Sequence, residues 1–125
     1  MPIKVLLVDD SDVMRRAIRR LLEEQPDIEL VGEASDFVET VQMTTKFRPQ
    51  VIVMDLNMKN DMTVSGDVKP NLDDCDARVV AISFANDETA HTLANKFGAV
   101  TLLDKMELVN ELIPTIKKFA ACGLH

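Results

Sequence analysis

The sequence has few cysteines and no excess of basic residues, and both shortages narrow the functions it can have. Cys75 and Cys122 are the only cysteines, and they show neither CxxC spacing nor a neighbouring histidine cluster. We therefore interpret both as reduced thiols without a metal or redox role. The 125 residues carry 14 basic against 21 acidic side chains, a net charge of -7. This balance argues against direct binding of nucleic acid.

The densest group of basic residues has the spacing of a helix surface. Side chains three and four positions apart lie on the same side of a helix, and charged runs of this kind usually face solvent. We expect a solvated helix face from Arg15, Arg16, Arg19 and Arg20.

Long apolar runs are also missing. None approaches the roughly 20 residues that a membrane span needs, and the chain reaches Asp9 and Asp10 too early for a secretory signal. We therefore expect a cytoplasmic protein without membrane contact. Neither an internal repeat nor a low-complexity linker divides the sequence. Its length fits one domain, expected at residues 1–121, with 122–125 as a tail that could begin a removed linker.

Short apolar runs alternate with segments of helical periodicity. Predicted strands span residues 4–8, 28–34, 51–55, 79–83 and 100–103. The first predicted helix is capped by Ser11 or Asp12 and ends before Pro26, and later helices span about 36–47, 87–97 and 107–121. The apolar positions assigned to the first helix are Val13, Met14, Ala17, Ile18, Leu21 and Leu22.

Two segments interrupt this pattern. Residues 59–77 show little helical periodicity, so the third helix is expected to be short or irregular. Pro114 should kink the last helix or mark a fresh start. Repeated strand-helix units of this kind predict an α/β domain, a doubly wound five-stranded parallel sheet with helices on both faces.

Polar residues follow four of the predicted strands. Asp9 and Asp10 follow the first, Asp55 ends the third, Ser83 ends the fourth and Lys105 follows the fifth. Ligands of such folds bind at the carboxyl ends of the strands. We therefore expect these five side chains at one edge of the sheet.

Three neighbouring carboxylates repel one another unless a cation joins them. Magnesium suits such a site, because it prefers oxygen ligands and often shares its shell with a phosphate. Asp55 could then act as a nucleophile toward phosphorus, Lys105 would neutralise charge on the transferring oxygens, and Ser83 would donate a hydrogen bond to them. Because no residue is evident that activates water or builds a substrate pocket, we expect a switch that carries an acyl phosphate rather than a conventional enzyme.

The motifs LLVDDS, VMDLNM, AIS and LLDK resemble those of the CheY-like receiver family of response regulators, in order and over nearly the whole chain. The resemblance implies flavodoxin-like strand order 2-1-3-4-5 and phosphorylation of Asp55. It implies that Asp10 binds Mg2+ directly, Asp9 mainly through water, and that the backbone carbonyl of Asn57 completes the protein ligands. The implied donor is a phosphohistidine on a sensor histidine kinase or a histidine phosphotransfer protein.

The chain departs from the pattern of that family near the site. Lys59 stands where most members have a proline, and Gly66 comes later than their usual glycine. Phe84 replaces a small residue and is expected to narrow the entrance. Leu102 occupies the switch position, where the family has an aromatic residue, and Met106 replaces a proline.

Two other hypotheses about the function remain open. A pseudo-receiver would be a binding module of the same fold whose output does not depend on phosphorylation, and Phe84, Leu102 and Met106 favour it. A small haloacid-dehalogenase-like phosphatase also uses an aspartyl phosphate and Mg2+, but Met14 breaks its DxDx(T/V) motif. A flavin binder is disfavoured, because no Ser/Thr/Gly-rich loop follows the first strand.

The resemblance also implies a contact surface. In the family, a homodimer partner or an output domain docks on the face made by the helix over about 87–97, the strand over about 100–103 and the last helix. Leu102, Met106 and Ile113 are the expected apolar contacts there.

Overall fold

The computed structural model describes residues 2–56, 77–84, 87–96 and 98–122. The expected irregular third helix falls outside these residues, as do Asn57, Lys59, Gly66 and Cys75. None of the described helices is long and apolar enough to cross a membrane.

A five-stranded parallel sheet forms the centre of the domain, in the order β2-β1-β3-β4-β5. The expected fold class and strand order are thus confirmed. The strands are β1 (Ile3–Val8), β2 (Ile28–Ala34), β3 (Val51–Asp55), β4 (Arg78–Ser83) and β5 (Ala99–Asp104). The described helices are α1 (Asp12–Glu23), α2 (Phe37–Phe47), α4 (Glu88–Lys96) and α5 (Leu108–Cys122), with a 3-10 turn, η2 (Lys105–Glu107), before α5.

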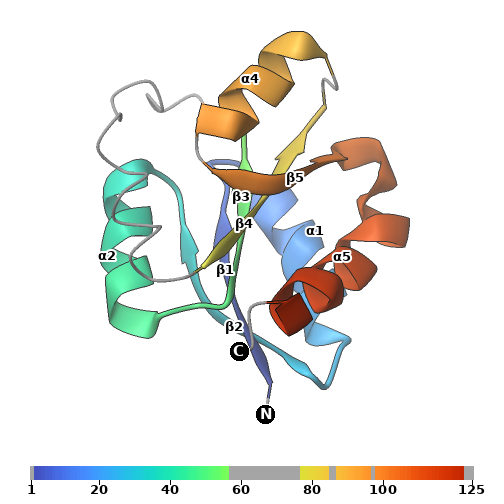
Figure 1. Cartoon of the computed structure of the whole chain (residues 1–125). Helices are drawn as coiled ribbons and strands as arrows, with labels where there is room; N and C mark the ends of the chain where they lie inside the picture. Colours follow the sequence, from blue (N-terminus) through green and yellow to red (C-terminus); the bar gives the residue numbers. More distant parts are fainter. Residues whose placement is uncertain (1, 57–76, 85–86, 97, 123–125) are drawn as a thin grey trace.

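Helices cover both faces of the sheet, with α1 and α5 on one side and α2 and α4 on the other (Figure 1). Successive residues of a strand point to opposite faces, so each central strand contributes to two cores. Leu6 and Ile52 belong to the cluster beneath α2 and α4, whereas Val5 and Val53 belong to the cluster beneath α1 and α5. Because both faces are covered, β1, β3 and β4 are apolar along most of their length.

Two of the apolar positions expected in helix α1 do not face the core. Ile18 and Leu22 are buried, but Val13 is 76% exposed and Ala17 is also exposed. At 100° per residue, Val13 lies about 140° around the helix from Ile18, and Ala17 about 100°. A sequence step of four between Val13 and Ala17 therefore describes a second stripe, which faces solvent.

The last helix agrees with its predicted span of about 107–121, but one of the two alternatives for Pro114 is wrong. The η2 turn begins at Lys105 and α5 at Leu108, and α5 continues through Pro114 to Cys122 without a fresh start. A proline inside a helix removes one backbone hydrogen bond. The buried side chains of Leu112, Ile116 and Ala120 flank this position and keep α5 packed on the sheet.

Candidate phosphoryl-acceptor site

The carboxyl end of β1 passes directly into the first acidic residues. Asp9 is fully buried, and its backbone N–H donates to the Ala34 carbonyl of β2 at 3.0 Å. Its Oδ1 accepts a hydrogen bond from Ser11 N at 2.8 Å, while Ser11 Oγ caps α1 by accepting from Met14 N. The turn between strand and helix therefore fixes the direction of the Asp9 carboxylate.

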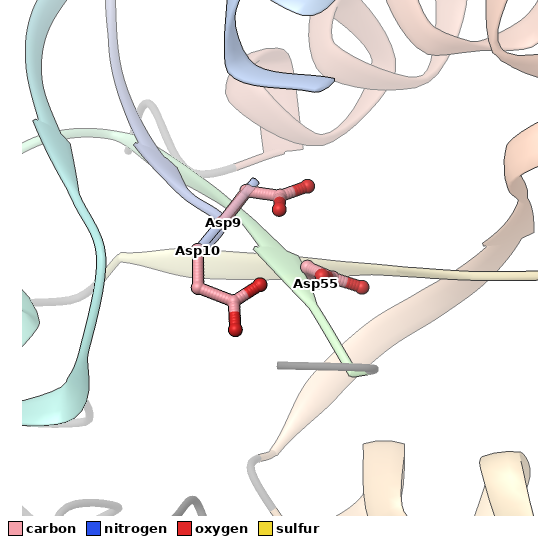
Figure 2. Close-up of side chains that lie close together, drawn as sticks. All are labelled: Asp9, Asp10 and Asp55. Atoms are coloured by element: carbon pink, nitrogen blue, oxygen red, sulfur yellow. The ribbon is translucent and has the colours of Figure 1, made fainter. Parts of the chain in front are cut away.

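Asp55 ends β3 and brings a second carboxylate to the same place. It is 2% exposed, and the next backbone N–H, of Leu56, donates to the Ile82 carbonyl of β4 at 2.9 Å. One carboxylate oxygen from each of Asp9, Asp10 and Asp55 lies within 4.8 Å of the other two. Figure 2 shows this group, with Asp9 and Asp10 at the end of β1 and Asp55 at the end of β3.

Lys105 reaches this cluster from the end of β5. Its Nζ lies 2.7 Å from Asp55 Oδ1 and 4.0 Å from Asp9 Oδ2. The η2 turn that carries it is capped by Asp104, whose carboxylate accepts from Met106 N at 2.9 Å. Lys105 thus contacts two of the three clustered carboxylates, and the cluster holds more acidic side chains than this one ammonium can neutralise.

Burial perturbs the acidity of Asp9. It is the main cause that raises the Asp9 pKa from 3.8 to about 6; the hydrogen bond from Ser11 N opposes the shift, and the neighbouring charge of Asp55 adds to it. Asp9 Oδ2 is buried and receives no hydrogen bond from the described residues. A buried carboxylate oxygen that lacks a hydrogen bond and lies among acidic neighbours fits a hard cation such as Mg2+.

The remaining predicted residues lie near this edge in different ways. Ser83 is buried at the end of β4, one residue beyond the pairing of Ile82 with Asp55. Phe84 follows it and is 59% exposed, with its ring over Lys105 Nζ at 4.6 Å from the centroid. Leu102 pairs with Ala81 in the sheet and packs against the core beneath α2 and α4.

The expected apolar docking face is less uniform than the sequence indicates. Met106 is 76% exposed, but Leu102 and Ile113 are partly buried against different cores on opposite faces of the sheet. Of these three residues, Met106 alone is a large exposed hydrophobic side chain.

The predicted solvated face of arginines is wrong for Arg15. Its guanidinium donates to the Asp9 carbonyl at 2.6 Å, pairs with Asp12, and lies 3.4 Å from Glu33 of β2. Arg19 makes two hydrogen bonds to the same Glu33 carboxylate, at 2.8 and 2.9 Å. These two arginines are four residues apart, so they share the side of α1 that faces the end of β2.

Sequence reasoning missed this contact with the turn that carries Asp9. The four-residue spacing of Arg15 and Arg19 was visible, but the acidic partner, Glu33, is far away in sequence. Arg16 and Arg20 are exposed as expected.

Comparison with known proteins gives a consistent result. The family model of the response regulator receiver domain matches residues 5–117. The transcriptional regulatory protein LiaR of Bacillus subtilis is 33% identical over 116 residues, covering 92% of this chain and 54% of LiaR. A protein-glutamate methylesterase/protein-glutamine glutaminase of Methanococcoides burtonii is 57% identical over 56 residues, which cover 45% of this chain and 16% of that protein. The chain thus spans about half or less of these curated relatives.

Solved structures agree. The response regulator domain of Thermotoga maritima CheB has a TM-score of 0.81 and 28% identity, covering 97% of this chain and 98% of that one. A LuxR-family response regulator from Aurantimonas sp. SI85-9A1 has a TM-score of 0.82 and 26% identity, covering 98% of this chain and 87% of that one. With the family model matching most of its length and the acidic cluster at the expected strand ends, the chain belongs to the receiver domains of two-component response regulators.

Proposed function

We propose that this receiver accepts a phosphoryl group on Asp55 and that the modified domain acts as a phosphorylation switch in two-component signalling. One observation carries the proposal: the buried Asp55 carboxylate lies 2.7 Å from Lys105 Nζ, inside a cluster of three carboxylates. A pair buried for stability alone would not need two further acids beside it.

Each residue of the site has a distinct role in this proposal. An Asp55 carboxylate oxygen attacks phosphorus, the bond from phosphorus to the donor breaks, and the donor leaves with the electron pair. Lys105 keeps its protons and neutralises charge on the transferring oxygens. The Ser83 hydroxyl, buried at the neighbouring strand end, donates a hydrogen bond to the same group.

We assign the metal to Asp9, Asp10 and Asp55, with the backbone carbonyl of Asn57 as a further ligand. Bound Mg2+ would supply charge neutralisation to the acidic cluster and to the phosphoryl oxygens. The hydrogen bond from Ser11 to the Asp9 carboxylate and the donation from Arg15 to the Asp9 carbonyl restrain this residue and support the assignment.

The phosphoryl donor and the partner that responds to the modified domain are proposed from the chemistry of the site. A phosphohistidine on a sensor histidine kinase or on a phosphotransfer protein would be the donor. Because the relatives extend well beyond the matched region, an output domain or a second copy of the receiver would be the partner on the face formed by α4, β5 and α5. Leu102 would serve there as the switch position.

A second candidate is the pseudo-receiver, and the large exposed side chain of Phe84, directly after Ser83, favours it. In that case the domain would bind its partner without any dependence on phosphorylation. The two candidates differ in whether Asp55 can be modified at all.

The test is incubation with Mg2+ and acetyl phosphate, followed by intact mass measurement. We expect wild type to gain one phosphoryl group and Asp55→Asn to gain none. Asp27→Asn is the matched control, because Asp27 pairs with Lys117 on the surface, and it should react like wild type. Beryllofluoride should likewise bind only chains that retain Asp55. Failure of wild type to form any Asp55-dependent adduct would favour the pseudo-receiver.

A further inference from the structure

The Phe84 side chain occupies an unusual position for a large aromatic residue. It lies directly after Ser83, is 59% exposed, and places its ring over the Lys105 ammonium at 4.6 Å from the centroid. A cation over the face of an aromatic ring within about 6 Å is attracted by the quadrupole of the ring. The exposed ring therefore has a specific electrostatic partner.

The same ammonium is the group that contacts Asp55. Its Nζ is 2.7 Å from Asp55 Oδ1, and the Lys105 side chain is only 4% exposed. A lysine stem is flexible and its charge strongly hydrated, so an unrestrained ammonium would tend to turn toward water. The ring of Phe84 covers Lys105 and opposes that motion.

We propose that Phe84 is a positioning residue for Lys105. The Phe84 ring holds the Lys105 ammonium beside Asp55, where the charge of the phosphoryl group must be neutralised. The inference rests on the proposed phosphoryl transfer. Phe84 takes no part in bond making: the Asp55 oxygen bonds to phosphorus, the donor leaves with the electron pair, and Lys105 keeps its protons.

The competing explanation treats the ring as a steric barrier to the donor. The two explanations predict opposite signs. If the ring positions Lys105, its removal slows modification of Asp55, whereas removal of a barrier speeds it. Phe84→Leu separates them, because leucine keeps apolar bulk but has no aromatic face, and Phe84→Tyr restores that face.

The contact itself can be tested without metal or donor. In lysine-labelled full chain, the protons beside the Lys105 ammonium should show an NMR shift caused by the ring current of Phe84. We expect Phe84→Leu to remove this shift and Phe84→Tyr to keep it. An unchanged Lys105 signal in Phe84→Leu would overturn the proposal.

The functional arm measures the rate of Asp55 modification by acetyl phosphate with Mg2+ across donor concentrations. We expect Phe84→Leu to lower the maximal rate about threefold to tenfold, to leave the half-saturating donor concentration unchanged, and to be rescued by Phe84→Tyr. Phe119→Leu is the matched control, because Lys118 Nζ lies 5.3 Å from that ring in α5, and its rate should equal that of wild type.

Each outcome has one meaning. If Phe84→Leu reacts as fast as wild type or faster, the positioning role is wrong. If wild type forms no Asp55-dependent adduct, the proposed function fails, and the NMR measurement still decides whether Phe84 holds Lys105.

Discussion

Ion pairs at the two edges of the sheet differ in burial, and this difference separates an edge that holds buried charge from an edge whose charges are exposed to water. At the carboxyl edge, the side chains of Lys105 and Asp55 are 4% and 3% exposed and lie 2.7 Å apart. At the amino edge, Lys117 Nζ of α5 lies 3.3 Å from Asp27 Oδ2, and the two side chains are 43% and 51% exposed. Water screens the second pair but not the first.

The carboxyl edge also lacks charge balance. Three carboxylates and one ammonium are gathered there, and the burial of charge costs free energy that one pair does not recover. Such violations of ordinary packing rules are expected at functional sites. The comparison therefore predicts that substitutions at the carboxyl edge change stability strongly and depend on Mg2+, whereas those at the amino edge do neither.

The largest effect is expected from Lys105→Ala. Removal of the ammonium leaves the buried Asp55 without its cation, which should lower the free energy of unfolding by about 3 kcal/mol in chelator. Urea denaturation at pH 7.5 measures the loss, and saturating Mg2+ should reduce it. Lys118→Ala, at an exposed position of α5, is the control and should leave stability nearly unchanged. Equal losses in the two variants would show that the carboxyl edge has no special electrostatic character.

The next effect concerns pH. Because folding raises the Asp9 pKa from 3.8 to about 6, the folded chain binds the proton more tightly than the unfolded chain between these values. Metal-free stability should therefore increase as pH falls from 8 to 5 and decrease as pH rises through 6. The full shift corresponds to about 3 kcal/mol, of which about half is expressed between pH 8 and pH 5. Unfolding in urea with chelator, from pH 5 to 8, measures this dependence.

The control for that experiment is Asp9→Asn, whose amide oxygen can still accept from Ser11 N. It should be more stable than wild type at pH 8. The difference should be about halved at pH 5 and should vanish only below the unfolded pKa of 3.8. Mg2+ should bind wild type more weakly as pH falls through 6, because the proton and the cation compete for Asp9. A stability difference that is constant with pH would remove Asp9 as the titrating group.

The gathering of Asp9, Asp55 and Lys105 was predictable because it depends only on topology. Parallel strands align their carboxyl ends, so any residue that directly follows a strand reaches that edge whatever the helices do in detail. The strand order needed more than periodicity. It came from the resemblance of the motifs to a known family.

Contacts between side chains of different elements could not be predicted in the same way. Arg15 donates to the Asp9 carbonyl because of the rotation of α1 about its axis and the position of Glu33 on β2, neither of which the sequence states. Phe84 was expected to narrow an entrance, but its contact with Lys105 depends on how β4 and β5 are paired. Val13 shows the same limit, since its stripe on α1 faces solvent.

The smallest effect is expected from Lys117→Ala at the amino edge. An exposed ion pair contributes little because water and salt screen it, so the loss of unfolding free energy should be about 0.5 kcal/mol or less. It should disappear in about 1 M salt, where charges are screened beyond about 3 Å. Urea denaturation at low and high salt, beside Lys105→Ala, measures both edges under the same conditions. A loss at Lys117 that matched the loss at Lys105 and persisted in salt would contradict the distinction, because burial would then not be what separates the two pairs.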